Sequence, residues 1–166
     1  MNLNIYHNLN QFNKYRHFNE ILSSKFGKVY ENKIYWNYIC INQKLSEEFI
    51  ENHHEKVNWN SICKCQTLSE KIIEKFQHKV SWGLVCQIQT LSEEFLKKHQ
   101  DKLNWNLVSA FQTLSEKFIK EFHKNVNWVF ISQYQELSEK FIIEFKKKVD
   151  WEYIFMFQKL SEEFIE

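Results

Sequence analysis

Hydrophobic and polar positions along this chain repeat every 23 residues. A typical repeat opens WNLVSAFQTLSEKFIK, residues 105–120, in which Trp is followed by Ile or Val three residues later, by Gln seven residues later and then by Leu-Ser-Glu. The tryptophans that open the repeats are Trp36, Trp59, Trp82, Trp105, Trp128 and Trp151. A fixed period of this size predicts a stacked array of one small structural unit. We expect the tryptophan side chains to be buried inside that array.

The first half of each repeat has the spacing of a short helix, which we call the A helix. In the repeat that begins at Trp59, the inward positions are Trp59, Ile62, Cys63 and Gln66. This i, i+3, i+4, i+7 spacing predicts one buried helix face about two turns long. The residue before most of the tryptophans is a good N-cap, as at Asn58, Ser81, Asn104, Asn127 and Asp150. Tyr35 departs from this pattern.

The second half predicts another helix, the B helix. It begins at a Ser that Glu always follows, at Ser46, Ser69, Ser92, Ser115, Ser138 and Ser161. A Ser hydroxyl caps the first turn of a helix, and an acid in that turn suits the helix dipole. Leu68 precedes one such cap, and apolar residues at Ile72, Ile73, Phe76 and Val80 then continue the inward face.

Such short helices are unstable alone, so the repeats must stack to bury their apolar faces. The predicted fold is all-α, an α-solenoid of stacked two-helix repeats within one domain, residues 1–166. Its repeats span residues 36–58, 59–81, 82–104, 105–127 and 128–150, with a partial repeat at 151–166. Residues 1–35 are predicted to form a degenerate N-terminal cap, because Leu22 to Phe26 match the Leu-Ser-Glu-x-Phe columns while Asn13 replaces the Trp.

Composition supports a helical protein in the cytoplasm. The 166 residues are 43% hydrophobic, include no Pro and only two Gly, and carry a net charge of +1. So few turn-forming residues argue against a β-sandwich or barrel. We find neither a secretion signal nor an apolar run of roughly 18 residues, so no membrane partner is expected.

The sequence predicts no enzyme, cofactor or metal site. It has no Ser-His-Asp order, phosphate-binding Gly loop or HExxH motif. Cys63 and Cys65, with His53 and His54 upstream, match no common zinc spacing. The other cysteines share the column of Cys63, which Ser109 and Ser132 continue, so we interpret this column as small packing residues; it comprises Cys40, Cys63 and Cys86. Stacked helices lie too far apart for a ladder of disulfides.

Two polar columns admit a structural and a functional interpretation. His53 and His99 replace Phe in one column of the B helix, and packing is favoured over acid–base chemistry. The glutamines form an unbroken column at Gln43, Gln66, Gln89, Gln112, Gln135 and Gln158. They either grip an extended peptide or close helix ends and bond the next repeat's backbone. We favour the second interpretation, since buried amides require partners.

Candidate partner-binding residues lie in the columns that vary between repeats. The column two residues after the Trp contains Tyr38, Leu84, Leu107, Phe130 and Tyr153. With Ile88, Phe111, Tyr134 and Phe157, it makes the A helix apolar nearly all round, so it is either buried, which we favour, or lines a groove. The B helix carries a ridge of lysines that either faces solvent, the favoured interpretation, or meets phosphates; these are Lys97, Lys98, Lys120, Lys124 and Lys147.

The phrase LSEEFIENHHEKVNWN, residues 45–60, resembles short tryptophan-containing repeats in uncharacterised proteins of giant viruses and bacteriophages. The resemblance extends from about Leu22 to the end of the chain. It implies a viral or phage source, a location in the host cytoplasm and recognition of a host protein or ribonucleoprotein complex, as an inhibitor of host defence. It implies no active site.

Three functional hypotheses follow from these patterns. The first is a non-enzymatic protein-binding scaffold. The second is a nucleic-acid or ribonucleoprotein binder that uses the lysine ridge. The third is a self-assembling structural protein. Because the partial repeat has no successor in the sequence, we predict a homodimer formed through the C-terminal end, where an exposed apolar patch would mark an interface; it would use Phe157, Leu160, Phe164 and Ile165.

Overall fold

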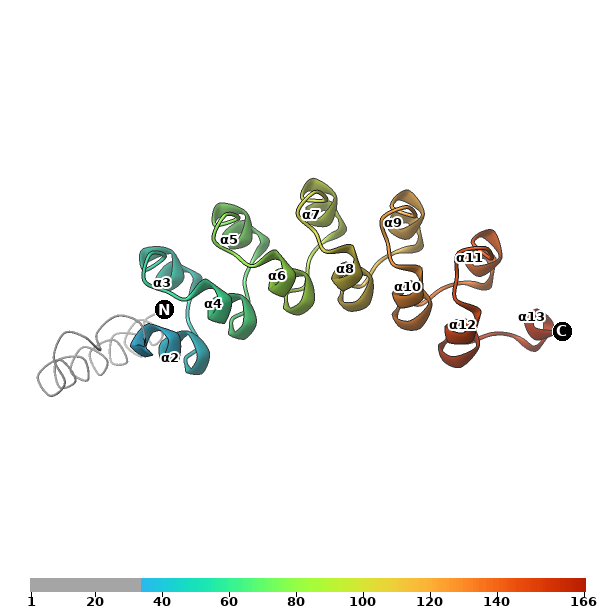
Figure 1. Cartoon of the computed structure of the whole chain (residues 1–166), viewed down its shortest axis with the longest axis horizontal. Helices are drawn as coiled ribbons and strands as arrows, with labels where there is room; N and C mark the ends of the chain where they lie inside the picture. Colours follow the sequence, from blue (N-terminus) through green and yellow to red (C-terminus); the bar gives the residue numbers. More distant parts are fainter. Residues whose placement is uncertain (1–33) are drawn as a thin grey trace, which may run out of the picture. The chain divides into compact units, whose positions relative to one another are not determined.

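The computed structural model describes residues 34–166, which form helices and no strand (Figure 1). The A helices are α2 (Ile34–Asn42), α4 (Trp59–Cys65), α6 (Trp82–Ile88), α8 (Trp105–Phe111), α10 (Trp128–Tyr134) and α12 (Trp151–Phe157). The B helices are α3 (Glu47–Asn52), α5 (Glu70–Lys75), α7 (Glu93–Lys98), α9 (Glu116–Glu121), α11 (Glu139–Glu144) and α13 (Glu162–Ile165). The predicted all-α repeat array is thereby confirmed. The predicted N-terminal cap lies outside the described residues, apart from the first two residues of α2.

The chain divides into two compact units, Met1–Gln66 and Thr67–Glu166, and each is described by itself. We call them unit one and unit two. In unit one, α2 packs on α4. In unit two, α6 packs on α8, α8 on α10 and α10 on α12. Within unit two the A helices thus form one row and the B helices a second row beside it (Figure 1).

Helix caps occur where the sequence predicts them, with one exception. The Ser before each B helix accepts from the amide three residues later, for example Phe95 N to Ser92 Oγ at 3.2 Å. Asn58, Asn104, Asn127 and Asp150 cap A helices in the same way. Ser81 has the extended backbone of an N-cap, but its side chain forms no capping bond.

The B helices are shorter than the apolar spacing predicts. α5 ends at Lys75, and Phe76 closes it with φ −112° and ψ 30°. The chain then turns, because Lys79 N and Val80 N both bond to Phe76 O, at 2.8 and 3.1 Å. Val80 nevertheless stays buried. Because Val80 faces inward although it lies beyond the end of α5, the apolar spacing predicted a helix that was too long.

The tryptophans pack mainly against the B helix of their own repeat. The Trp128 ring centroid lies 6.3 Å from that of Phe141 and 5.0 Å from that of Phe145. Its Nε1 donates to His123 O, five residues earlier, at 3.0 Å. The tryptophans are less buried than predicted: five are half-buried and Trp151 is 36% exposed. The ring covers one edge of the aromatic cluster, so its outer side remains accessible.

The glutamine column ties successive repeats together. Gln112 Oε1 accepts from Leu91 N at 3.0 Å, while its Nε2 donates to Cys86 O at 2.8 Å and to Gln89 O at 2.7 Å. Gln66, Gln135 and Gln158 repeat all three bonds. These glutamines therefore bond to the backbone of a neighbouring repeat, as the structural interpretation predicted. The neighbour is the preceding repeat, however, and not the next one.

A second link between repeats uses the Glu of Leu-Ser-Glu. Glu93 Oε1 accepts from the backbone N of Ser115 in the following repeat at 2.6 Å. The same bond joins Glu70 to Ser92, Glu116 to Ser138 and Glu139 to Ser161. This Glu therefore fixes the spacing of the B helices in unit two, beyond its expected effect on the helix dipole.

Candidate protein-interaction surface

Every A helix of unit two exposes an apolar residue at the same position, six residues after the Trp. Ile88 is 47% exposed, Phe111 53%, Tyr134 55% and Phe157 50%. One turn earlier, the half-buried residues Leu84, Leu107, Phe130 and Tyr153 extend the same apolar strip. We call these eight residues the A face.

On α10 and α12, the aromatic side chains of the A face lie in pairs along the helix. The rings of Phe130 and Tyr134 lie 6.1 Å apart, and those of Tyr153 and Phe157 stack at 6.0 Å. Leu107 Cδ1 lies 3.8 Å from the position that a Cβ would take on Gly83 in the preceding A helix. The column two residues after the Trp therefore packs between helices in part, whereas the column six residues after it faces outward.

The A helices of unit two are almost free of charge. Of the residues in α6, α8, α10 and α12, Glu152 is the one that is ionised at neutral pH. The predicted site residue Tyr38 lies in unit one, where it is 61% exposed on α2. The other four predicted apolar site residues, Leu84, Leu107, Phe130 and Tyr153, fall within the A face.

The predicted binding lysines lie on the B helices or just after them, and three of these lysines are ion-paired to a neighbouring repeat. Lys98 pairs with Glu74 and Lys120 with Glu144. Lys97 pairs with Glu121 at 2.5 Å. Lys124 and Lys147 are exposed. The acids that compensate these lysines lie one repeat away, so the pairing was not evident from the sequence of a single repeat.

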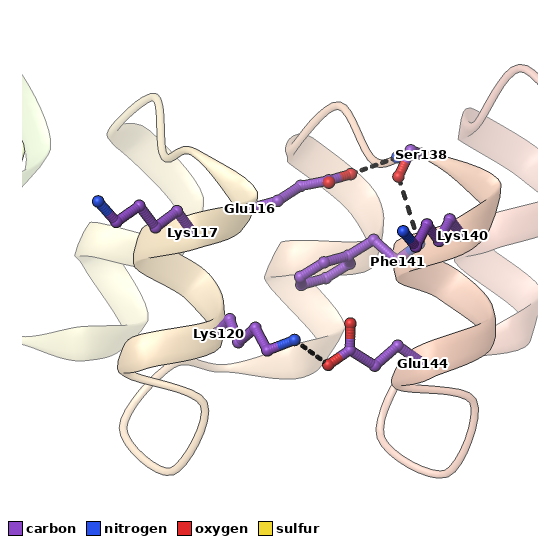
Figure 2. A pocket seen from close by; sticks show the side chains of 7 residues that line it. All are labelled: Glu116, Lys117, Lys120, Ser138, Lys140, Phe141 and Glu144. Atoms are coloured by element: carbon purple, nitrogen blue, oxygen red, sulfur yellow. Dashed lines mark hydrogen bonds and ion pairs between the residues drawn. The ribbon is translucent and has the colours of Figure 1, made fainter.

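A shallow pocket of about 300 Å³ lies between α9 and α11. Figure 2 shows that its polar groups already bond to one another across the gap, Glu116 to Ser138 and Lys120 to Glu144. Phe141, which is buried, forms its apolar wall. The pocket is thus a gap between two repeats that the inter-repeat bonds close over, with no arrangement suited to acid–base or nucleophilic chemistry.

The two predicted packing histidines lie in aromatic clusters. His53 stacks on Phe49 at 4.3 Å and bonds through Nδ1 to Phe49 O at 2.9 Å. His99 is 5% exposed and lies 5.1 Å from Trp82 and 4.4 Å from Phe95, between ring centroids. Its Nε2 has no hydrogen-bond partner. Burial lowers the pKa of His99 below 6.5, and Lys102 and Lys98 lower it further against the opposing effect of Glu74 and Asp101.

The cysteine column is buried as small packing residues. Cys40, Cys63 and Cys86 are fully buried, Cys65 is exposed, and none of the four forms a disulfide. Burial raises the pKa of the Cys40 and Cys86 thiols. Among residues 34–166, no three His, Cys, Asp or Glu side chains gather into a possible metal site.

The predicted self-association residues are accessible to different degrees. Phe157 and Ile165 are exposed, at 50% and 62%, while Leu160 and Phe164 are half-buried. Phe155 and Met156, which the sequence analysis did not single out, are more exposed than Phe157, at 59% and 62%. Comparing α12 with the earlier A helices column by column would have revealed them, because small or amide side chains occupy the same positions in α10.

No protein-family model, curated protein or solved structure matches this chain, and its surfaces are therefore interpreted from their own chemistry. None of the helices within residues 34–166 is both long and apolar enough to cross a bilayer.

Proposed function

We propose that this chain is a non-enzymatic protein-binding scaffold that receives its partner on the A face of unit two. The observation that carries the proposal is the row of outward apolar side chains on four successive helices, each about half exposed. Leaving such a strip in water is unfavourable, and extended apolar surface of this kind usually marks an interaction site. The buried residues that stack the repeats lie in other columns, so the outward column, six residues after the Trp, is free to vary between repeats.

Aromatic and aliphatic contacts would supply most of the affinity. Each Å² of apolar surface removed from water contributes roughly 25 cal/mol, and the Tyr and Phe rings are of the kind that dominates interface energetics. Because the A helices of unit two are nearly uncharged, burying them costs little desolvation of ions. The expected partner presents an apolar, uncharged surface, and its binding is insensitive to salt.

A narrower proposal concerns the identity of the partner. The resemblance to repeats of giant-virus and phage proteins supports a host complex as the target, with inhibition of host defence as the outcome. The A face supports protein recognition in general, and the resemblance alone supports the host complex.

Nucleic-acid binding through the lysine ridge is the weaker candidate. Lys97, Lys98 and Lys120 are each neutralised by a Glu of a neighbouring repeat. Phosphate binding requires several uncompensated cations, and its affinity falls steeply as salt rises. Self-association is supported separately by the exposed apolar residues Phe157 and Ile165.

The test compares two double variants as bait for affinity capture with mass spectrometry, using lysate of cells in which the protein naturally occurs. Phe111→Glu with Tyr134→Glu places two charges on the A face. Lys117→Glu with Lys140→Glu changes two exposed residues of the B row and serves as the matched control. We expect the partner to be retained by the unmodified chain and by the control, even at about 0.5 M salt, where exposed ion pairs are screened.

The A-face variant should lose that partner while keeping its helical circular dichroism spectrum and melting temperature. Capture that survives the A-face substitutions would contradict the proposal. Capture that disappears at high salt would favour the nucleic-acid alternative.

A further inference from the structure

In α6, α8 and α10, the side of the A helix that receives the next repeat has a small residue four positions after the Trp. In unit two these residues are Cys86, Ser109 and Ser132, and all three are fully buried. The two serines also bond forward: Ser109 Oγ accepts from Asn127 N and Ser132 Oγ accepts from Asp150 N, both at 2.9 Å. A small hydroxyl is therefore part of the joint between repeats.

In α12 this column holds Phe155, which is 59% exposed. A phenyl ring cannot accept the backbone hydrogen bond that Ser132 accepts, and it fills the space in which the next N-cap would lie. Met156 follows where α10 has Gln133, and it is 62% exposed. This side of α12 is thus shaped for something other than another repeat of the same kind.

Two opposite charges flank these apolar residues. Glu152 lies in the first turn of α12, three residues before Phe155. The same column holds Val129 in α10 and Asn106 in α8, and Asn106 Oδ1 accepts from Asn127 Nδ2 across a joint between repeats at 2.8 Å. Lys159 follows the helix, three residues after Met156, and both charged residues are exposed. We call Glu152, Phe155, Met156 and Lys159 the α12 end patch.

We propose that the α12 end patch binds a second copy of this chain, with the two α12 helices packed antiparallel about a two-fold axis. The two charges are spaced symmetrically along the sequence, since an acid lies three residues before the Phe-Met pair and a base three residues after it, beyond the extended C-cap Gln158. Antiparallel pairing therefore places Glu152 of one copy beside Lys159 of the second copy at both ends. Phe155 and Met156 meet at the axis, as a closed isologous interface requires.

This inference goes beyond partner binding, because it uses a side of α12 that lies outside the A face. It also differs from self-association through Phe157, Leu160, Phe164 and Ile165, since the column comparison selects other residues. The contact between helices is apolar at its centre and charged at its rim. The apolar centre therefore supplies affinity, whereas the charged rim selects the antiparallel direction.

Sedimentation velocity of the full chain tests the proposal. Phe155→Ser with Met156→Gln restores the residue types of α10 and should give a monomer at concentrations up to about 100 µM, where the unmodified chain is dimeric. Its helical circular dichroism should be unchanged, because both side chains are exposed. Phe111→Glu with Tyr134→Glu should dimerise as the unmodified chain does, so failure of the proposed function and failure of this inference remain distinguishable.

A charge swap tests the antiparallel register. Glu152→Lys alone and Lys159→Glu alone should each weaken dimerisation about tenfold, and the double variant should restore it, because the pairs reform with reversed sign. An unmodified chain that stays monomeric would overturn the proposal. So would a dimer that Ile165→Glu abolishes but Phe155→Ser with Met156→Gln does not, or a double charge variant no better than the single ones.

Discussion

At the scale of single residues, one glutamine per repeat satisfies backbone groups that no helix can satisfy. Gln112 is 4% exposed and forms three hydrogen bonds, all to the preceding repeat. Its Oε1 accepts a hydrogen bond from a backbone amide just before a B helix, and its Nε2 donates to two backbone carbonyls near the end of an A helix. A side chain with both a donor and an acceptor is therefore required at this position.

Replacing Gln112 with Leu should lower the free energy of unfolding by about 3 kcal/mol or more, since each abandoned buried group costs about 1–3 kcal/mol. Gln87→Leu changes an exposed amide in the same unit and should shift stability by less than about 0.5 kcal/mol. Urea unfolding followed by circular dichroism measures both. Equal midpoints for the two variants would mean that the glutamine bonds contribute nothing.

His99 shows the opposite case, a polar residue in an apolar column with an unsatisfied nitrogen. Its neighbours are aromatic rings, and Phe76, Phe122 and Phe145 occupy the same column in other repeats. Because its pKa is lowered on folding, the folded chain favours neutral His99. The unfolded chain takes up the proton first as the pH falls below 6.5, so acid favours unfolding.

His99→Phe should therefore stabilise the protein at neutral pH by about 1 kcal/mol or more, because it removes a buried unsatisfied group. The gain should be constant above pH 6.5 and should grow as the pH falls below that value toward the lowered folded-state pKa. Melting temperatures of both proteins between about pH 7.5 and 5.5 give the comparison. A difference that does not change with pH would show that His99 is not a source of acid sensitivity.

At the scale of elements, the helices are stable through their neighbours and not through their length. The B helices are at most six residues long and the capped A helices seven. Isolated helices of this size do not persist in water. In the repeats that begin at Trp36, Trp82, Trp105 and Trp128, a Trp–Phe–Phe or Trp–Phe–His cluster joins the two helices. Hydrogen bonds from Gln and Glu side chains join one repeat to the next.

Trp105→Ala should therefore lower the free energy of unfolding by about 3 kcal/mol. This value is at the lower end for aromatic truncations, because the ring is half-buried. Trp105 lies 5.1 Å from Phe122 and 6.2 Å from Phe118, between ring centroids. Trp151→Ala should cost less, since Trp151 is 36% exposed and its ring contact is the exposed Phe155, 5.7 Å away. Denaturant unfolding of both variants tests this order, and a larger loss for Trp151 would contradict it.

The sequence predicted what depends on a single repeat and missed what depends on two. The period, the paired helices and nearly all of the caps follow from local spacing. The direction of the Gln112 bonds, the Glu93–Ser115 link and the Lys98–Glu74 pair depend on how one repeat is placed against the next. Hydrophobic periodicity does not specify that placement. For the Glu93–Ser115 link, the available signal in the sequence was the Glu that follows every Ser.

At the scale of the whole molecule, unit two separates its chemistry by row. Its A helices carry Glu152 as their one ionised residue, whereas its B helices are lined with lysine–glutamate pairs between repeats. The charged row keeps the molecule hydrated even though the A face is apolar. Exposed ion pairs of this kind contribute roughly 0–1 kcal/mol each, so their main effect is on solubility and the choice of partner.

The links from Gln and Glu side chains to the neighbouring repeat have a mechanical consequence. In unit two they join residues only 21 to 26 positions apart. A pulling force along the chain would therefore load one joint after another, with no distant contact to share the tension. Each repeat that gave way would release 23 residues, about 80 Å of extended chain. Unit two would lengthen in regular steps and recover them one by one, as a spring of separate coils does.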